Sequence, residues 1–163
     1  MGGDLSPANG FQWFSLQNWS PESMLAGVQA AAPVLDSFIS EQADKYEIPA
    51  DRIALLGFSQ GTMVSLYAGP RYPHKLAGVL GFSGALVWED DTRTEDVQQI
   101  PVHLVHGKDD PVIPVEAIIH AKQHLEGAGF TVGAEVFPGL THGVHEGAVL
   151  SGVTFLKGVL GYE

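Results

Sequence analysis

The sequence contains no cysteine, which excludes disulfides, thiolate metal ligands and cysteine nucleophiles. Basic residues are also scarce, because only 8 Lys and Arg stand against 19 Asp and Glu, for a formal net charge of −11. A nucleic-acid groove or an anionic membrane surface requires the opposite sign of charge. We therefore expect neither of these among the partners of the protein.

Long apolar runs are missing as well. None approaches the roughly 18–20 residues that a membrane-spanning helix requires. The segment Met1–Leu5 has neither the basic region nor the apolar region of a signal peptide. Both absences predict a cytoplasmic protein without a membrane span.

Apolar residues nevertheless make up 45% of the 163 residues, which is enough for one buried core. We expect a single domain over residues 1–163, with an irregular segment over residues 1–20. Ser20 and Pro21 form a typical helix start, whereas Pro33 predicts a kink or a break near Ala32. The apolar spacing predicts helices over 21–46, 60–68, 115–125 and 144–160, and strands over 53–58, 76–82, 101–106 and 130–137.

Short apolar strands that alternate with helices predict an α/β fold. Its parallel sheet should have about four strands, flanked by helices. In such sheets, ligands bind beyond the carboxyl ends of the strands. Functional residues are therefore expected directly after each strand.

Ser59 lies in the run Gly57-Phe58-Ser59-Gln60-Gly61, directly after one predicted strand and directly before a helix. A serine in this context is typical of a nucleophile on a tight turn, with the two glycines leaving room for close backbone packing. The backbone N–H of Gln60 is the natural oxyanion donor, because it follows the nucleophile at a helix N-terminus. The alternative is that Ser59 only caps the helix.

A serine nucleophile requires a base, and the base requires an orienting carboxylate, expected in the chain order Ser, Asp, His. The candidates are Asp109 and Asp110 after the third strand, and His142 and His145 after the fourth. We favour Asp110, because the adjacent Pro111 stiffens its turn, and His142, which lies in the loop before the last helix. Asp109 is then a solvated loop acid. His145 is a surface residue, with a substrate contact as the alternative.

The remaining histidines are predicted to be structural or solvent-facing, namely His74, His103, His106, His120 and His124. His120 and His124 have the four-residue spacing of zinc ligands on a helix, but no Glu or Cys completes such a site. We therefore expect no metal and no cofactor.

Three stretches resemble one known family. Ile48–Gly61 is very similar to the nucleophile segment of the phospholipase/carboxylesterase family of α/β-hydrolases, which includes bacterial carboxylesterases and acyl-protein thioesterases. In His106–Pro114, the family's catalytic acid precedes the proline and corresponds to Asp110. In Thr141–Val144, its catalytic histidine corresponds to His142. The resemblance implies a partial α/β-hydrolase fold with a serine, histidine and aspartate triad.

Phe11–Phe14 also resembles the aromatic segment before the family's first long helix, but two departures stand out. Thr62 replaces a second glycine after the nucleophile. The family's earlier strands, and the His-Gly-x-Gly type loop that supplies a second oxyanion N–H, are not found here. Strand 53–58 would then be an exposed apolar edge. We expect it to pair with another chain, in a homo-oligomer or with a separate partner.

The resemblance implies a carboxylesterase-type serine hydrolase that cleaves short-chain acyl esters, with acyl-protein thioesterase or lysophospholipase activity as alternatives. A non-catalytic or weakly active binding protein is the rival, because loss of one oxyanion donor lowers rates by about 10²–10³. Large apolar side chains near the turn are predicted to line an acyl pocket, namely Trp13, Phe14, Phe58, Met63 and Trp88.

Overall fold

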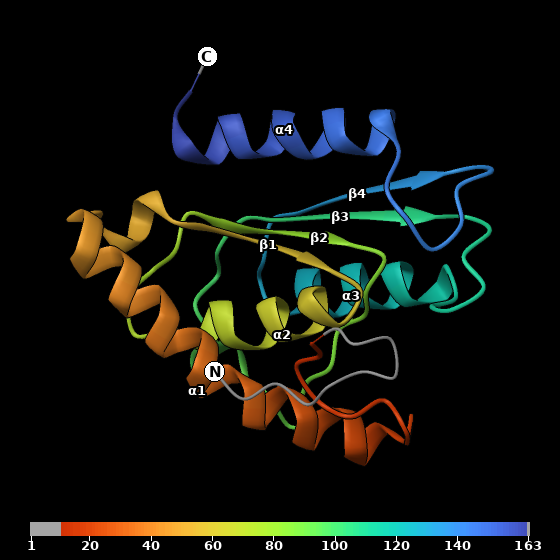
Figure 1. The fold of residues 1–163 in the computed structure, drawn as a ribbon, viewed down its shortest axis with the longest axis horizontal. Helices are drawn as coiled ribbons and strands as arrows, with labels where there is room; N and C mark the ends of the chain where they lie inside the picture. The colour runs from red at the N-terminus through yellow and green to blue at the C-terminus, as the bar shows by residue number, and fades with distance from the viewer. Residues whose placement is uncertain (1–10, 163) are drawn as a thin grey trace.

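The computed structural model describes residues 11–162 and contains one parallel sheet, in which the four strands follow the order of the chain. The elements are α1 (Pro21–Tyr46), β1 (Ala54–Phe58), α2 (Gln60–Ala68), β2 (Gly78–Phe82), β3 (Val102–Gly107), α3 (Glu116–Gly127), β4 (Val132–Phe137) and α4 (Glu146–Leu160). Figure 1 shows the last helix, α4, on one face of this sheet and the helices α1, α2 and α3 on the other. The predicted parallel sheet of about four strands flanked by helices is confirmed.

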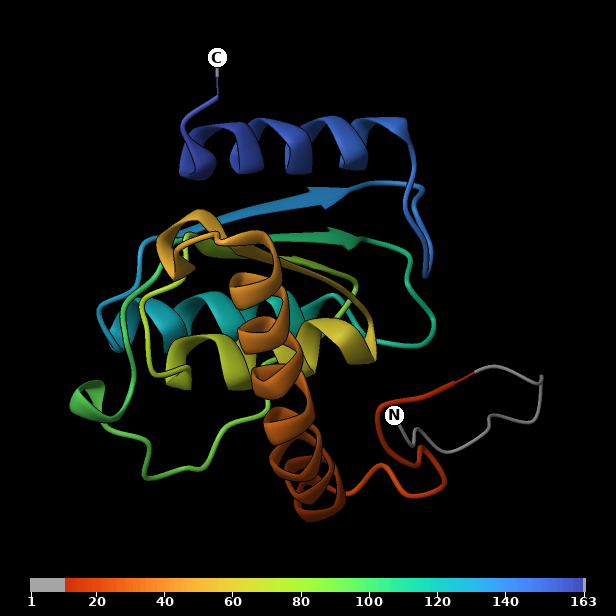
Figure 2. The same ribbon diagram turned by 60° about the vertical axis from the view of Figure 1, so that its left-hand side comes forward.

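Helix α1 begins where the sequence predicts, because the Ser20 hydroxyl accepts the N–H of Ser23 and caps the first turn. No break interrupts it at Pro33, which lies on the exposed face of the helix. On the opposite face Val28 and Leu35 are buried, and this packing holds the helix together across the missing N–H. Figure 2 shows that α1 runs across α2.

The irregular segment expected over 1–20 is described only from residue 11 on, where it contains no helix.

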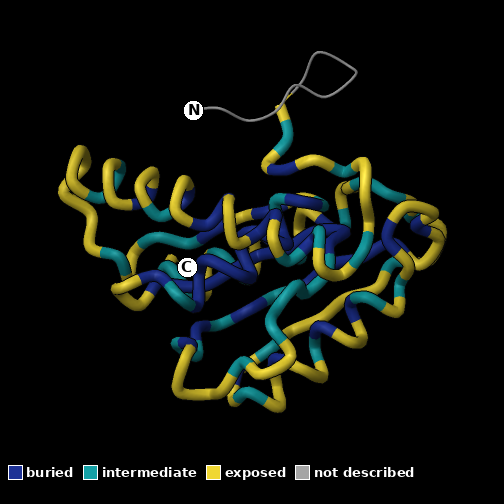
Figure 3. Tube along the Cα trace, turned by 90° about the horizontal axis from the view of Figure 1, so that it is seen from below, coloured by how far each residue is buried: buried dark blue, intermediate teal, exposed yellow. Residues whose placement is uncertain are grey.

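The core lies on the face of the sheet that α1, α2 and α3 cover, and a smaller apolar cluster lies beneath α4. Figure 3 shows buried stretches through the middle of the molecule and exposed turns on the outer helices. Strand β2 is buried along its whole length. Strand β1 is an edge, where Leu55 is buried but Leu56 is 59% exposed and Phe58 is 43% exposed.

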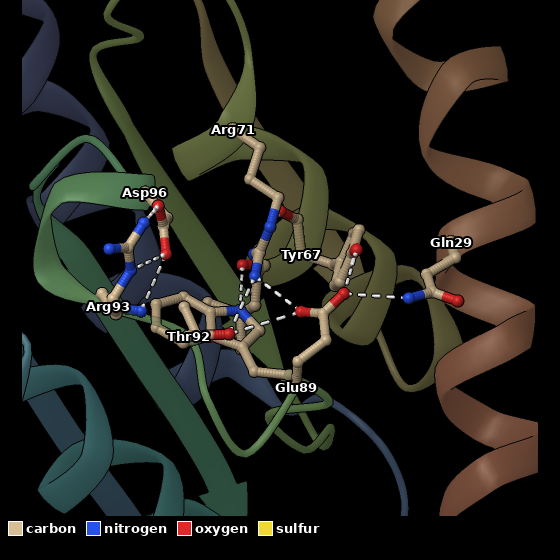
Figure 4. A network of polar contacts seen from close by, with 9 residues as sticks. Gln29, Tyr67, Arg71, Glu89, Thr92, Arg93 and Asp96 are labelled. Atoms are coloured by element: carbon tan, nitrogen blue, oxygen red, sulfur yellow. Dashed lines mark hydrogen bonds and ion pairs between the residues drawn. The ribbon is translucent and has the colours of Figure 1, made fainter.

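A polar network holds the long connection between β2 and β3 against α1 and α2 (Figure 4). At its centre is Glu89, whose carboxylate accepts hydrogen bonds from the Tyr67 hydroxyl at 2.6 Å and the Gln29 amide at 2.9 Å. Arg71 pairs with the other carboxylate oxygen at 2.9 Å. Burial raises the pKa of Glu89, but these hydrogen bonds and the charge of Arg71 outweigh it and lower the pKa from 4.5 to about 2.

The Glu89→Gln variant is expected to be less stable than the wild type at pH 7, and the difference should shrink in acid. Because the folded-state pKa is depressed, ionised Glu89 contributes stability above pH 4.5, and this contribution is lost as the pH falls toward 2. Urea unfolding at pH 7, 5 and 3 measures the free energy of unfolding of both proteins. A difference that does not change over this range would contradict the assignment.

The matched control is Glu95→Gln, which removes a 3.1 Å ion pair with Arg93 between side chains about two-thirds exposed. An exposed pair of this kind should change the free energy of unfolding by less than about 1 kcal/mol.

Candidate active site

Ser59 occupies the turn between β1 and α2 with φ 53° and ψ −114°, a conformation that side-chain-bearing residues rarely adopt. Such strain costs on the order of 1–3 kcal/mol and concentrates at functional sites. The Ser59 N–H donates to the carbonyl oxygen of Phe82 at 2.8 Å, which ties the turn to the end of β2. The Ser59 side chain makes no capping hydrogen bond to α2, so helix capping does not explain this serine.

The two glycines around Ser59 differ in their packing. A Cβ at Gly57 would overlap the backbone of Gly61 and Thr62, so the close approach of β1 and α2 requires glycine there. A Cβ at Gly61 would meet only the Trp13 indole nitrogen at 3.9 Å, an ordinary contact. The sequence predicted that both glycines make room for the backbone, and this is wrong for Gly61.

Asp110 and His142 form the second part of the site. Oδ2 of Asp110 lies 2.8 Å from Nδ1 of His142, and its Oδ1 accepts the N–H groups of Val112 at 2.8 Å and Ile113 at 2.9 Å. Burial raises the pKa of Asp110, but the hydrogen bonds from His142 and from these two N–H groups outweigh it and hold the pKa below its usual value. An ionised carboxylate only accepts, so Nδ1 of His142 carries the proton and Nε2 is left as the basic nitrogen.

Two neighbouring residues that the sequence did not assign to the site hold this pair. His106 is 1% exposed, and its Nε2 lies 2.8 Å from the Ile113 carbonyl and 3.5 Å from Oδ2 of Asp110. A carbonyl only accepts, so Nε2 of His106 carries a proton and faces the carboxylate. Asp109, predicted to be a solvated loop acid, is exposed but accepts the N–H of Gly139 at 2.7 Å. It thereby fixes the loop that carries His142.

The parallel sheet brings this pair to the same edge as Ser59, because β1, β3 and β4 all end there. The ring of Phe58, the residue before Ser59, lies 5.0 Å from the ring of His142, centroid to centroid. A Cβ at Gly107 would overlap the backbone at Leu140, so glycine lets the His142 loop pack against the end of β3. The N–H of Gln60, at the first position of α2, has no acceptor among residues 11–162.

A pocket of about 670 Å³ opens beside Ser59, between α1 and the free edge of β1. Trp13 and Phe58, two of the predicted pocket residues, line it. The other three lie outside its lining. Phe14 and Met63 are buried in the core, and Trp88 donates its indole N–H to the Leu66 carbonyl at 2.9 Å.

The other histidines have structural contacts. Nδ1 of His145 accepts the Ala148 N–H at 3.0 Å and caps α4. His103 lies 2.7 Å from the Ser151 hydroxyl. The rings of His120 and His124 lie 4.3 Å apart on α3, and within residues 11–162 no third His, Asp or Glu joins a group able to hold a metal ion.

Replacing Gly57 by Ala is expected to destabilise the protein by about 1–3 kcal/mol, because the added methyl group overlaps the first turn of α2. Gly61→Ala is the matched control. It should be neutral or stabilising by about 0.5–1 kcal/mol, since alanine is the better helix former and the site is open. Thermal and urea unfolding compare the two variants with the wild type. Equal stability of the two variants would contradict the packing described for the turn.

Comparison with known proteins assigns this arrangement to a family. Residues 4–160 match the Phospholipase/Carboxylesterase family model. Acyl-protein thioesterase 1 of Gibberella zeae is 34% identical over 121 residues, which cover 71% of this chain and 51% of the thioesterase. Esterase YpfH of Escherichia coli is 29% identical over 135 residues, which cover 83% of this chain and 57% of the esterase.

Among solved structures, esterase PE8 superposes with a TM-score of 0.88 at 30% identity, covering 96% of this chain and 74% of that one. The Bacillus cereus carboxylesterase, at 17% identity and a TM-score of 0.75, shows the fold alone. The chain thus spans about half of the length of the thioesterase and three-quarters of esterase PE8. Its sheet, its strained serine turn and these matches lead to one conclusion: the chain belongs to the phospholipase/carboxylesterase family of α/β-hydrolases.

Proposed function

We propose that the protein is a serine hydrolase that cleaves carboxylic esters, with Ser59 as nucleophile, His142 as base and Asp110 as orienting acid. The observation that carries this proposal is the 2.8 Å contact between Asp110 and His142 at the sheet edge where Ser59 stands on its strained turn. The contact fixes the tautomer and the orientation of the His142 imidazole, at the end of the sheet where the Ser59 side chain is not used to cap its helix.

In the proposed reaction, Nε2 of His142 takes the hydroxyl proton as Ser59 attacks the ester carbonyl. The backbone N–H of Gln60 binds the oxyanion, and the imidazolium, stabilised by Asp110, gives its proton to the leaving alkoxide. Water deprotonated by His142 then attacks the acyl-enzyme, which releases the carboxylic acid and restores Ser59. Every proton in this cycle moves between His142, Ser59, the substrate and water, so the chemistry calls for no metal or cofactor.

Short-chain acyl esters are the proposed substrates. The pocket next to Ser59 has apolar walls from Trp13, Phe58 and α1. The matched relatives are named as esterases and acyl-protein thioesterases, so thioesters, and also lysophospholipids, are the alternative substrates. A non-catalytic binding role is the rival function.

Within residues 11–162, no helix is long and apolar enough to cross a membrane. The cytoplasmic location and the single-domain organisation stay predictions.

We also propose that the free edge of β1 pairs with a second copy of this chain. Among the strands of residues 11–162, β1 has a neighbour only on the β2 side, and Leu56 is 59% exposed. An exposed apolar edge strand is a template for strand addition. The Leu56→Lys variant should sediment as a monomer, while the wild type sediments at a higher mass. Leu150→Lys is the matched control, because Leu150 is also 59% exposed but lies on α4. A monomeric wild type would refute the pairing.

The Ser59→Ala variant is expected to lose nearly all hydrolysis of p-nitrophenyl acetate and butyrate, because it has no nucleophile and keeps only the residual effect of the oxyanion donor and of substrate binding. Initial rates at saturating and subsaturating ester give kcat and KM for the wild type and the variant. A wild type no faster than Ser59→Ala would refute the hydrolase proposal and favour the binding role.

The Asp110→Asn variant is expected to lose about 10⁴-fold in kcat, because an amide favours the wrong tautomer of His142. Asp109→Asn is the matched control. Its side-chain oxygen still accepts the Gly139 N–H, so kcat should change little. The same p-nitrophenyl assay measures both variants. A larger loss of kcat in Asp109→Asn than in Asp110→Asn would show that Asp110 is not the orienting acid.

A further inference from the structure

The side chain of Gln60 makes contacts that its backbone role does not require. It is 9% exposed, and its Oε1 accepts the backbone N–H of Trp13 at 2.6 Å while its Nε2 donates to the carbonyl of Phe14 at 2.8 Å. A backbone N–H only donates and a carbonyl only accepts, so these two partners fix the orientation of the amide. Gln60 thus bonds to the backbone of two consecutive residues, 46 and 47 positions away in the chain.

These contacts hold residues 11–19, which we call the strap, against the N-terminus of α2. The strap contains no helix or strand of its own that would keep it in place. Its second anchor is the Phe14 ring, which is 8% exposed and sits where a Cβ at Gly27 of α1 would overlap it. The strap is therefore held at residues 13 and 14. Gln60 on α2 bonds to their backbone, and Gly27 on α1 leaves room for the Phe14 ring.

Trp13 is held through its backbone N–H by Gln60, and its side chain is 42% exposed. Its indole nitrogen approaches the open space at Gly61, and its side chain lines the pocket next to Ser59. The strap therefore makes Trp13 a wall of the pocket, next to Gly61, which lies two positions after the proposed nucleophile. The same residue, Gln60, follows Ser59 in the chain and fastens this wall.

We propose that the side chain of Gln60 is a positioning group that sets acyl-chain selectivity, by holding Trp13 against the acyl chain of the substrate. The inference rests on the proposed function of Ser59 and adds a second role to Gln60, distinct from that of its backbone N–H. The substrate class that this wall favours is esters of linear acyl groups longer than acetyl. Each methylene group that gains contact in an apolar pocket is worth roughly 10-fold or more in discrimination.

The test is the ratio of kcat/KM for p-nitrophenyl hexanoate to that for p-nitrophenyl acetate. Any loss of turnover common to both esters cancels in this ratio. Gln60→Leu, which removes both hydrogen bonds at similar volume, and Trp13→Ala should each lower the ratio about tenfold. The double variant should have a ratio no lower than either single variant, because both changes remove the same wall. Gln60→Glu keeps the acceptor for the Trp13 N–H but loses the donor to Phe14, so its ratio should fall between those of wild type and Gln60→Leu.

Ser20→Ala is the control for a merely structural effect. It removes the hydroxyl that caps α1 and lowers stability, but Ser20 is not among the residues that line the pocket, so the ratio should stay at the wild-type value. An unchanged ratio in Gln60→Leu and Trp13→Ala, with turnover that still depends on Ser59, would overturn this inference and leave the proposed function intact. Turnover equal to that of Ser59→Ala would instead overturn the proposed function, and the selectivity role with it.

Hydrogen exchange tests the clamp without reference to activity. The amide proton of Trp13 should exchange at least about tenfold faster in Gln60→Leu than in the wild type, because the variant offers no acceptor. Exchange at Trp13 should be unchanged in Ser20→Ala. Equal exchange in wild type and Gln60→Leu would show that Gln60 does not hold the strap.

Discussion

The carbonyl oxygen of Phe82 is the point on which the candidate site depends. It accepts the Ser59 N–H at 2.8 Å and the Thr62 hydroxyl at 2.9 Å, so one acceptor at the end of β2 binds both the turn and the first turn of α2. A strained φ persists only where the surroundings determine it several times over. Here the strain at Ser59 is held by this carbonyl and by the absence of a side chain at Gly57. The position of the Gln60 N–H, and of the strap that the Gln60 side chain fastens, follows from that turn.

The sequence predicted the elements well because each has a local signal. Four apolar strands, four helices at helical spacing and the Ser20 cap are all read within short windows. The order of Ser59, Asp110 and His142 in the chain, combined with the rule that the carboxyl ends of parallel strands lie at one edge, also predicted that these three follow strands that end at that edge. Packing details were predicted less well. Nothing local shows that Gly57 faces backbone while Gly61 faces open space, or that Phe14, Met63 and Trp88 lie outside the lining of the pocket.

The contacts that the sequence missed are long-range and made by polar side chains. The Gln60 amide reaches residues 13 and 14, Asp109 reaches Gly139, and Glu89 joins two helices to a connection without regular structure. None has a periodic signal, since each depends on two segments that meet only in the folded chain. The sequence contained one hint, a polar residue within an apolar segment, because a polar side chain that is buried requires hydrogen-bond partners. Gln60, at the first position of an apolar helix, was the residue to which that argument applied.

Thr62 shows how a departure from the family pattern is accommodated. The resemblance predicts a glycine there, and a larger side chain so close to the nucleophile turn would normally separate α2 from the sheet. Instead, Gly81 and Gly84 lack the side chains that would overlap Thr62, which is 1% exposed. The added volume is therefore taken up by β2 and the residues that follow it, and the added hydroxyl is satisfied by Phe82. The substitution thus adds a bond between helix and sheet, and it makes the geometry at Ser59 depend on glycines some twenty positions away in the chain.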